Sequence, residues 1–339
     1  MSITAGWVSQ LRSSSPSTSR HHEVSSSCLL YIADFSLPMT NYCNSSTVSS
    51  SPKHTLVRIP FENLTQHYSW HRTINVRPQH LFNKIVPWPS RRGGYCMEVN
   101  SLFHVVLLSL GYDVYMAGAR VYSKETGRYG GFSHCVNIVT IDNKKYMVDV
   151  GFGANGPTFP VLLEDDQPQR HFLGSTTMIR LVNEPIPQAV DQSQKVWVYQ
   201  QRIDPDPEWV PRFCFVNFEF LLEDIRGLNL NPWKSPTSWF TQKVIVSRFT
   251  TSLEEDGEKI LDQKFACMDR NPEILDSITI DGELVLFQDT LKWRRDGKTK
   301  LEVRFESEEQ RTEAIGKYFG IDLDEEDRLA ILGTVSAIK

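Results

Sequence analysis

The chain has 339 residues, of which 40% are hydrophobic and 23% charged, and its formal net charge is −5 at pH 7. This length suffices for two or three folded units, and the slightly acidic charge argues against a nucleic-acid-binding protein. No apolar stretch approaches the roughly 18 residues that a membrane-spanning helix needs, so we expect no membrane partner.

The cysteines and histidines indicate a reducing compartment and no metal site. Six cysteines, at positions 28, 43, 96, 135, 214 and 267, show neither a CxxC pair nor the spacing of a disulfide framework. The nine histidines form no set with the spacing of metal ligands. We therefore expect reduced thiols, a cytoplasmic location and no bound metal.

Residues 1–55 differ in composition from the rest of the chain. They are rich in serine, carry arginines at positions 12 and 20, and have no acidic residue before Glu23. Three explanations are open: a targeting peptide, a disordered tail, or an altered gene model that replaced the original start of the protein. Because no strong amphipathic arginine pattern is present, a disordered serine-rich segment or an altered gene model is favoured over targeting.

Residues 56–112 form a predicted helical region that contains the most informative thiol. Cys96 lies shortly after Gly93 and Gly94 and opens an apolar run, Cys96–Leu110, that fills more than one helical face. Such a run predicts a helix buried on most sides. A cysteine in the first turn of a helix feels unpaired amide groups and the positive end of the dipole, which favour thiolate. The structural alternative is a buried cysteine that acts as a small hydrophobic residue.

A β-hairpin is predicted next. Ser133–Ile141 and Lys144–Val150 alternate and are rich in β-branched residues, and Asp142 and Asn143 between them suit a tight turn. In that register Ile141 faces Lys144, which places His134 diagonally across from Asp149 on one face. Diagonal neighbours are about 7–8 Å apart at the backbone, so a carboxylate can reach an imidazole.

Cys96, His134 and Asp149 together predict a nucleophile, a base and the carboxylate that orients the base. Each has a structural alternative when taken alone: a buried thiol, a histidine satisfied on a sheet face, and a hydrogen-bonding carboxylate near a turn. The combination of all three favours covalent catalysis.

Residues 113–234 continue as serial short strands, which suggests an antiparallel barrel-like sheet. An acidic, proline-rich run at Asp204–Trp209 predicts an insertion loop. The expected strands are Val114–Val121, Cys135–Ile141, Tyr146–Val150, Met178–Val182 and Lys195–Gln201.

Residues 235–339 are predicted to combine strands with a final helix. That helix is expected near Ser307–Tyr318, with Glu308, Glu309 and Arg311 facing solvent. The expected strands are Val244–Phe249, Ser277–Ile280, Leu284–Phe287 and Thr290–Trp293.

The chain resembles the arylamine N-acetyltransferase family, fungal members included, from about residue 60 to residue 240. The matching segments follow the family's order, whereas its opening helices are not recognisable in residues 1–55. The segments are Pro60–Leu64, Arg92–Asn100 around Cys96, Gly130–His134, Val148–Gly153 and, less specifically, Ser235–Phe240.

The resemblance implies an α+β fold with an N-terminal helical region, a central antiparallel β-barrel and a C-terminal α/β lid. It also implies a ping-pong reaction. Cys96 takes an acyl group from acetyl-coenzyme A or malonyl-coenzyme A, and the acyl-cysteine passes it to an arylamine, arylhydrazine or N-hydroxyarylamine. In this reaction His134 keeps the thiol ionised and then assists proton removal from the amine, while Asp149 holds the ring.

The resemblance also assigns residues to the two substrates. Gly130, Gly131 and Thr237 would contact the coenzyme, and Glu62 would pair with Arg92 behind the nucleophile. Core packing is the alternative for the aromatic residues, and a turn at the start of a strand is the alternative for the glycines. The residues expected around the aromatic acceptor are Phe61, Ser133, Phe152 and Phe240.

Two other functions stay open from the sequence. A cysteine hydrolase of the transglutaminase or papain type would use the same three residues but would bind peptides instead of coenzyme A. A catalytically impaired homologue is suggested by the unusual residues 1–55. The choice between acetyl and malonyl donors would depend on a cation near the acyl group, for which Arg120 and Arg128 are weak candidates.

Overall fold

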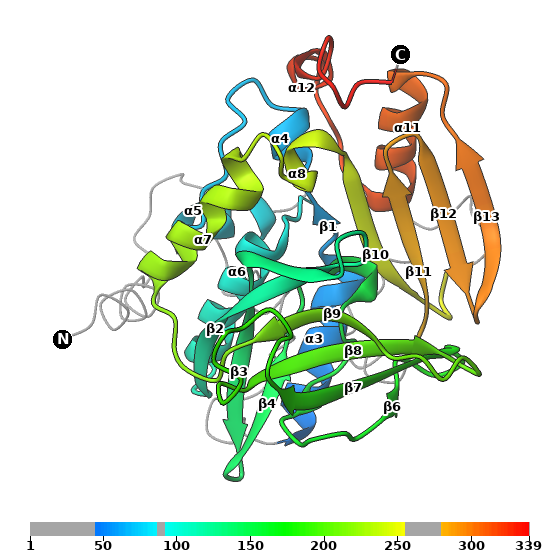
Figure 1. The fold of residues 1–339 in the computed structure, drawn as a ribbon. Helices are drawn as coiled ribbons and strands as arrows, with labels where there is room; N and C mark the ends of the chain where they lie inside the picture. The colour runs from blue at the N-terminus through cyan, green and yellow to red at the C-terminus, as the bar shows by residue number, and fades with distance from the viewer. Residues whose placement is uncertain (1–44, 87–91, 255–278, 339) are drawn as a thin grey trace, which may run out of the picture.

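The computed structural model describes residues 45–86, 92–254 and 279–338, which contain two antiparallel β-sheets and the helices around them (Figure 1). This mixture confirms the predicted α+β class. The helices are α3 Ser45–Arg58, α4 Leu64–His67, α5 Pro78–Ile85, α6 Cys96–Ser109, α7 Leu222–Lys234, α8 Trp239–Gln242, α11 Glu308–Phe319 and α12 Glu325–Ala330, with a short 3-10 helix, η1, at Gly153–Asn155.

Helix α3 corrects part of the prediction for residues 1–55. The chain is helical from Ser45 onward, whereas residues 1–44 lie outside the described part of the structure. Leu56 and Val57, near the end of α3, are buried in a core that also contains Phe103 of α6 and Phe249. The apolar end of α3 is therefore the reason that this segment is part of the folded protein.

Helix α6 is buried on most sides, as its apolar sequence predicted. Every residue from Cys96 to Phe103 is buried, and Leu102 packs against Leu81 of α5. The chain leaves the helix at Gly111, whose φ of +85° is the left-handed conformation that glycine adopts without a steric cost. The N-terminal turn of α6 therefore lies inside the protein.

The larger sheet has eight strands in the order β5-β4-β3-β2-β9-β8-β7-β6, with β5 and β6 at its edges. It curls like an open half-barrel, and β7–β9 run across the direction of β2–β4 in Figure 1. Its inner face holds a core of aliphatic and aromatic side chains that includes Ala119, Val136 and Phe213. The strands are β2 Asp113–Ser123, β3 Arg128–Ile141, β4 Lys144–Val148, β5 Val161–Leu162, β6 Gln169–Arg170, β7 Thr177–Glu184, β8 Val196–Ile203 and β9 Val210–Phe215.

The β3–β4 hairpin has the predicted register. Ile141 pairs with Lys144, and the two turn residues, Asp142 and Asn143, have φ values of +50° and +60°. Both residue types tolerate this left-handed conformation, which lets the two strands twist together. The turn therefore fixes which residues of β3 and β4 share a face.

Besides the short elements β5, β6 and η1, one longer strand and one helix of this region were not predicted from the sequence. Strand β9 lies in the middle of the sheet, between β2 and β8, and helix α7 follows it. The predicted loop at Asp204–Trp209 is the connection from β8 to β9. β9 contains Pro211 and Arg212 and has no clean alternation, which is why its sequence does not read as a strand.

The smaller sheet combines one strand from the early part of the chain, β1, with four strands from its later part. Its order is β1-β10-β11-β12-β13, and β1 pairs with β10 through Phe61 and Ser247. Instead of the two strands expected at Ser277–Ile280 and Leu284–Phe287, the structure has one strand that runs through both segments from Ile280, and Ser277 lies outside the described residues. The strands are β1 Phe61–Glu62, β10 Ile245–Thr251, β11 Ile280–Phe287, β12 Thr290–Arg295 and β13 Lys298–Arg304.

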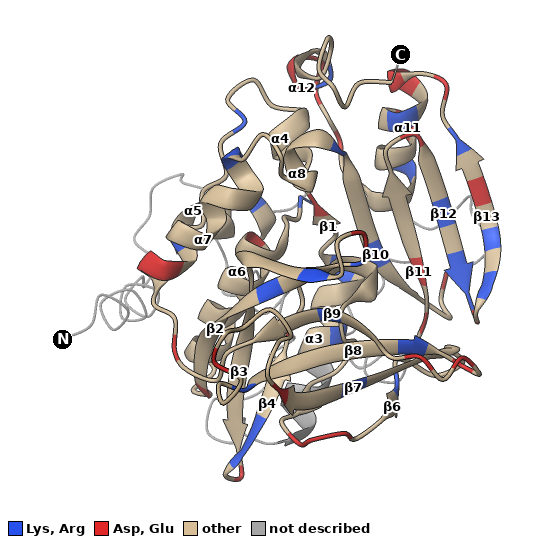
Figure 2. Cartoon of the chain, viewed as in Figure 1, with Lys and Arg blue, Asp and Glu red and all other residues tan. Residues whose placement is uncertain are grey.

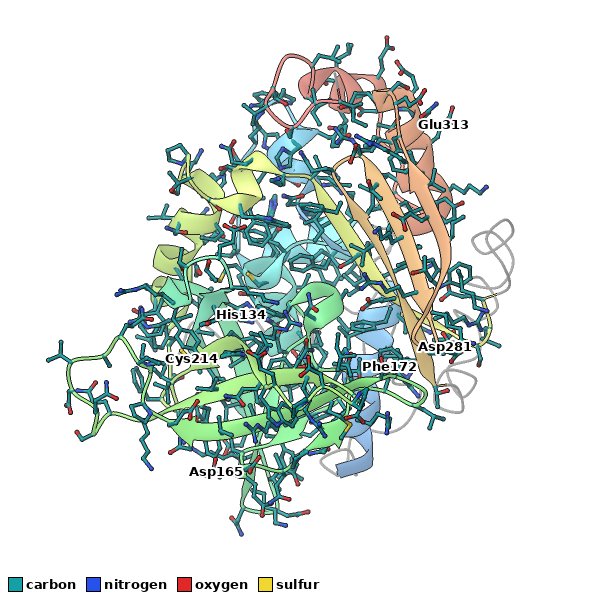
Figure 3. The ribbon with its side chains drawn as sticks, turned by 45° about the vertical axis from the view of Figure 1, so that its right-hand side comes forward. His134, Asp165, Phe172, Cys214, Asp281 and Glu313 are labelled. Carbon is teal, nitrogen blue, oxygen red and sulfur yellow. The ribbon has the colours of Figure 1, made fainter. Side chains whose placement is uncertain are left out.

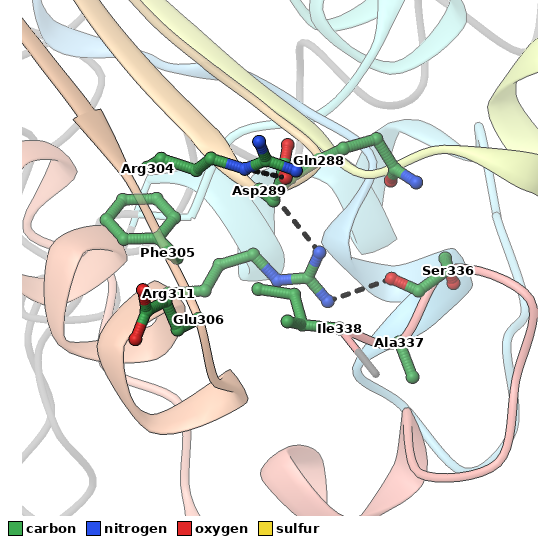
Figure 4. A pocket seen from close by; sticks show the side chains of 9 residues that line it. All are labelled: Gln288, Asp289, Arg304, Phe305, Glu306, Arg311, Ser336, Ala337 and Ile338. Carbon is green, nitrogen blue, oxygen red and sulfur yellow. Dashed lines mark hydrogen bonds and ion pairs between the residues drawn. The ribbon is translucent and has the colours of Figure 1, made fainter.

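Helix α11 covers one face of the smaller sheet, and the prediction that Arg311 faces solvent is wrong. Arg311 is fully buried, where it pairs with Glu308 and donates to the hydroxyl of Tyr68 at 2.7 Å. Figure 4 shows it between the carbonyls of Gln288 and Ser336, at 3.1 and 3.0 Å. A buried guanidinium is tolerated because these partners use its donors.

The outer strands of the smaller sheet carry both signs of charge, as Figure 2 shows along β12 and β13. Lys292 on β12 pairs with Glu302 on β13 at 2.9 Å. Such cross-strand pairs suit a solvated sheet face. In the part of the chain that the structure describes, no helix is both long and apolar enough to cross a membrane.

Candidate active site

The nucleophile candidate, Cys96, is held at the start of α6 by a close contact between two chain segments. Gly94 accepts a backbone hydrogen bond from Glu62 at 3.1 Å and donates one to Pro60 at 3.4 Å. A Cβ atom on Gly93 would lie 1.7 Å from the carbonyl oxygen of Pro60. Glycine is therefore required here, because any side chain would push the segment before Cys96 away from β1.

Buried ion pairs hold the first turn of α6 from behind. Arg92 donates to Glu62 at 3.0 Å, as predicted, and Lys84 donates to Glu98 at 2.7 Å. Burial by itself would raise the pKa of Glu62, but Arg92 and Lys84 outweigh it and lower that pKa to about 2. The other oxygen of Glu98 accepts from the backbone amide of Tyr95 at 3.2 Å, which caps the helix.

His134 and Asp149 meet as the hairpin register predicted. Nε2 of His134 lies 2.8 Å from Oδ2 of Asp149, and both side chains are almost completely buried. His134 belongs to β3, near the middle of the molecule in Figure 3, whereas Asp149 directly follows β4. Because a carboxylate only accepts, the hydrogen bond fixes the ring with its Nε2 proton toward Asp149.

Asn100 connects the helix to this hairpin and was not singled out in the sequence. Its Nδ2 donates to Oδ1 of Asp149 at 2.8 Å and to the carbonyl of Cys135 at 2.8 Å. Its Oδ1 accepts from the amide of Val150 at 2.9 Å. Asn100 is one helical turn after Cys96, so its spacing on the same face of α6 was the available signal.

The charges around His134 favour its protonated form. Burial lowers the pKa of the ring, but the Asp149 carboxylate, with a further contribution from Cys96, raises it to about 10. Its other nitrogen, Nδ1, is buried and has no nitrogen or oxygen partner among the described residues. The sulfur of Cys96 lies 3.8 Å from the carbonyl oxygen of Ser133, next to His134 in β3. A protonated ring beside a thiol stabilises the thiolate.

Aromatic rings surround the imidazole on its sheet side. The ring of His134 lies 5.0 Å from that of Phe152 and 5.1 Å from that of Phe213, between ring centroids. Phe152 and Phe213 are 4.8 Å apart. Phe152 was predicted for this site, whereas Phe213 was missed together with β9. These rings exclude water from the imidazole and fix its orientation.

A pocket of about 430 Å³ lies between the start of β1, the η1 segment and strands β10–β13. Two of the predicted aromatic residues, Phe61 and Phe152, line it. Through Phe152 the pocket adjoins His134. The other lining residues are Gly153, Ala154, Asn155, Ile245, Ser247, Glu283, Val285, Phe287, Thr290, Lys292, Arg294 and Glu302.

The third predicted aromatic residue, Phe240, lies beside this pocket without lining it. Its ring is 6.2 Å from that of Phe61 and 5.3 Å from that of Tyr95. The half-buried α8 segment thus completes an aromatic group next to the nucleophile helix. A larger pocket of about 650 Å³, shown in Figure 4, is lined by Arg304, Arg311 and neighbours and contains none of the predicted site residues.

The predicted coenzyme residues lie at the surface on two separate elements. Gly130 and Gly131 are exposed and precede His134 by four and three positions. They lie within strand β3 and not in a turn at the start of that strand. A Cβ atom on Gly131 would meet nothing within 4 Å. Thr237 is exposed between α7 and α8, and its hydroxyl is 3.0 Å from that of Ser235.

The geometry therefore combines a thiol at a helix N-terminus, a buried imidazole locked by a carboxylate, and an adjoining pocket with aromatic walls. This arrangement is suited to attack by sulfur on a carbonyl carbon and to proton transfer by the imidazole to the leaving group. In the described part of the chain the free cysteines are Cys96, Cys135 and Cys214.

Comparison with known proteins agrees with this geometry. A model of the N-acetyltransferase family matches residues 47–266. The chain is 30% identical over 321 residues to an N-malonyltransferase, FDB2, of Fusarium pseudograminearum, covering 88% of this chain and 84% of that one. It is 29% identical over 222 residues to arylamine N-acetyltransferase 2 of Mus musculus, covering 59% of this chain and 70% of that one.

A solved structure shares the fold. The arylamine N-acetyltransferase of Mycobacterium marinum, in complex with CoA, superposes with a TM-score of 0.66 and 24% identity, covering 89% of this chain and 95% of that one. Three observations point to the same family: the motif segments around the pocket, the curled antiparallel sheet and the relatives. The chain therefore belongs to the arylamine N-acetyltransferase family, a family of acyltransferases.

Proposed function

We propose that Cys96, His134 and Asp149 are a catalytic triad that carries an acyl group from a coenzyme A thioester to an aromatic amine. The hydrogen bond of 2.8 Å between His134 and Asp149 carries this proposal, because it prepares the ring for proton transfer on the face that adjoins Cys96. The relationship to an N-malonyltransferase and to an arylamine N-acetyltransferase supports the reaction class.

In the first half-reaction the thiolate of Cys96 attacks the thioester carbonyl. A new carbon–sulfur bond forms, and the bond to the coenzyme sulfur breaks. The leaving thiolate takes the proton that His134 holds, so the enzyme keeps an acyl-cysteine and a neutral ring. A thioester is exchanged for a thioester, so this step is close to balanced in energy.

In the second half-reaction the amine nitrogen attacks the acyl-cysteine carbonyl. The amide bond forms, the bond to Cys96 breaks, and His134 accepts the proton that the amine loses. Asp149 stabilises the imidazolium that results and keeps its Nε2 occupied, so that Nδ1 is the nitrogen that exchanges protons. The cycle returns thiolate and imidazolium to their starting state.

The substrates follow from the surroundings of the triad. Phe61, Phe152 and Phe240 offer flat apolar surfaces for an aromatic amine, and the Ser133 carbonyl lies beside the sulfur. The related structure that contains CoA supports a coenzyme A donor. For that donor we propose contacts with Gly130, Gly131 and Thr237. The donor is acetyl- or malonyl-coenzyme A.

The need for a reduced thiol fits a cytoplasmic location, which we propose as well. Oxidation of Cys96 would end the cycle, since only the thiolate is a nucleophile. The triad needs no metal in this reaction, because His134 performs both proton transfers.

The test is mass spectrometry of the intact protein after mixing with acetyl-coenzyme A in the absence of an amine. We expect one added acetyl group, located on Cys96 by peptide mapping and removed by addition of an aniline. Cys96→Ser should abolish the label, whereas Cys135→Ala, which changes the neighbouring buried thiol, should keep it.

The alternatives give different results in the same experiment. A cysteine hydrolase would show no stable adduct and would release free acetate. An impaired homologue would show neither an adduct nor acetate. Label on another residue with Cys96 unmodified would contradict the proposed nucleophile.

A further inference from the structure

Arg212 occupies an irregular position in the middle of the larger sheet. Tyr199 of β8 pairs with Phe213 of β9, but the next residue of β8, Gln200, pairs with Pro211, so Arg212 is an extra residue without a partner in the ladder. Such a β-bulge re-aims the side chain of the extra residue. Arg212 is thereby placed directly next to Phe213, whose ring packs on His134.

A single amide side chain holds the guanidinium and connects it to the pocket. Nε of Arg212 donates to Oε1 of Gln201 at 2.8 Å. Nε2 of the same Gln201 donates to the carbonyl of Asn155 at 2.8 Å and to the hydroxyl of Tyr199 at 3.1 Å. Gln201 is buried, and Asn155 lines the pocket of about 430 Å³. Gln201 therefore joins Arg212 to the η1 wall of that pocket.

Arg212 differs from the other cations of this region because it has no carboxylate partner. Arg294 pairs with Glu283 at 3.3 Å, and Lys292 pairs with Glu302 at 2.9 Å, so the charges that line the pocket are compensated. Among the described residues, no carboxylate forms an ion pair with Arg212, and its two terminal nitrogens, Nη1 and Nη2, make no hydrogen bond. These two terminal nitrogens, which can bind a carboxylate through two parallel hydrogen bonds, are thus available.

The guanidinium of Arg212 is half-buried, and its terminal nitrogens make no contact with a carboxylate of the described residues. Partial burial lowers the pKa of Arg212. Tyr199 and Glu283 raise this pKa, but they offset only part of the effect of burial. Nη1 and Nη2 together carry four N–H donors that a carboxylate can use. Arg120, one of the two cations considered from the sequence, is otherwise engaged: it covers the ring of Phe132 and donates to Gly130.

We propose that Arg212, positioned by Gln201, binds the carboxylate of a substrate in the proposed acyl transfer. Two sources offer this chemistry: the malonyl group of the donor and an aromatic amine that carries a carboxyl group. This inference rests on the proposed function. It adds a specificity residue that distinguishes charged from neutral substrates.

The experiment compares kcat/KM for three substrate pairs in the full-length protein. The pairs are acetyl-coenzyme A with aniline, malonyl-coenzyme A with aniline, and acetyl-coenzyme A with 4-aminobenzoate. We expect Arg212→Gln to lower kcat/KM by roughly 10- to 100-fold for the pair that contains the recognised carboxylate, since a hydrogen bond to a charged group contributes about 1.5–3 kcal/mol. The neutral pair should change by less than about threefold, and Arg212→Lys should restore part of the loss.

Arg180→Gln is the matched control. Arg180 lies on β7 of the same sheet and hydrogen-bonds a glutamine, Gln200, at 2.9 Å, but it pairs with Asp166 at 2.6 Å. Its replacement should leave the ratios between the three pairs unchanged.

The pattern of losses assigns the carboxylate. If kcat/KM falls only with malonyl-coenzyme A, Arg212 binds the carboxylate of the donor. If it falls only with 4-aminobenzoate, Arg212 binds that of the acceptor. If it falls with both, the two substrates share Arg212. An unchanged Arg212→Gln variant, or an equal loss for all three pairs, would overturn the inference. If the wild-type protein transferred no acyl group in any pair, the proposed function itself would fail, and the inference with it.

Discussion

At the scale of single residues, the site depends on how each hydrogen-bonding atom of Asp149 is used. Oδ2 accepts from His134 at 2.8 Å, while Oδ1 accepts from Asn100 and from the amide of Gly151, each at 2.8 Å. Three donors therefore converge on one buried carboxylate. This leaves a single orientation for the ring of His134 and for its proton.

The change Asp149→Asn should retain the fold and remove most of the activity. The amide oxygen would take the position that faces Asn100 and Gly151, so the NH₂ group would face Nε2 of His134 and force the ring proton onto Nδ1. A ring with its proton on Nδ1 cannot accept one from the thiol of Cys96 or from the amine. We expect the rate of coenzyme A release to fall by roughly 10²–10⁴-fold in a stopped-flow thiol assay.

Asp165→Asn is the control for that measurement, because Asp165 also accepts a backbone amide, that of Asn183, but at the surface. It should keep the wild-type rate. A rate for Asp149→Asn within threefold of wild type would show that the ring is oriented by other contacts.

Residue roles were predictable where both partners lie close together in the sequence. His134 and Asp149 are joined by one tight turn, so counting along the hairpin placed them together. Asn100 was not assigned and Arg311 was assigned wrongly, because most of their partners come from segments far apart in the chain. The same distance explains why Arg311 was expected in solvent: its helix is charged, and nothing local indicates Tyr68 or the carbonyl of Ser336.

At the scale of elements, the position of α6 depends on a short parallel contact. Phe61 in β1 forms a bridge with Gly94, and β1 is also paired with β10 on its other side. The start of α6 is therefore attached to the smaller sheet through a strand of only two residues.

Gly93→Ala should test this attachment. A Cβ atom at this position would lie 1.7 Å from the Pro60 carbonyl oxygen, so β1 and the segment before Cys96 would have to separate. We expect a loss of about 1–3 kcal/mol in the free energy of unfolding, by analogy with overpacked cores, and a larger relative loss of acyl transfer. Urea unfolding followed by circular dichroism measures the first effect.

Gly227→Ala provides the comparison. Gly227 is inside helix α7, and a Cβ atom there would meet nothing within 4 Å. The unfolding free energy should rise by about 0.5–1 kcal/mol, because alanine is the better helix former. Equal effects of the two changes would argue against a close contact at Gly93.

The elements that the sequence predicted are those with strong local patterns. The apolar run after Cys96 and the alternating strands of the hairpin were recognisable. The hydrophobic patterns that indicate a buried helix or a strand pair lie within a few consecutive residues. Strand β9 was missed, because its place in the sheet depends on partners 9 to 18 positions away in β8 and 92 to 96 positions away in β2. Its bulge at Arg212 has no sequence signature of its own.

At the scale of the whole molecule, several buried histidines make folding sensitive to acid. Burial lowers the pKa values of His67, His104 and His171 to about 4 each. A folded pKa below the unfolded value of about 6.5 means that the unfolded chain binds the proton first. The stabilisation is complete above pH 6.5 and is lost as the pH falls from 6.5 toward 4.

His171→Gln isolates one of these contributions. Nε2 of His171 donates to the carbonyl of Gly156 at 2.6 Å, and a glutamine amide offers the same donor without a titratable group. Between pH 7.5 and pH 5 the wild-type protein should lose about 2 kcal/mol more unfolding free energy than the variant, since 1.5 pKa units correspond to that amount. Urea titrations at four pH values give the difference, and parallel curves for the two proteins would contradict it.

The pairing of β1 with β10 also has a consequence for protein synthesis. β10, Phe240 and the pocket residues of β11 and β12 all follow the curled sheet in the chain, yet they form walls beside a thiol encoded near residue 96. A nascent chain whose last strands are still inside the ribosomal exit tunnel has no second wall around its sulfur. The wall of the pocket that β10–β13 provide is therefore added only when translation is nearly finished.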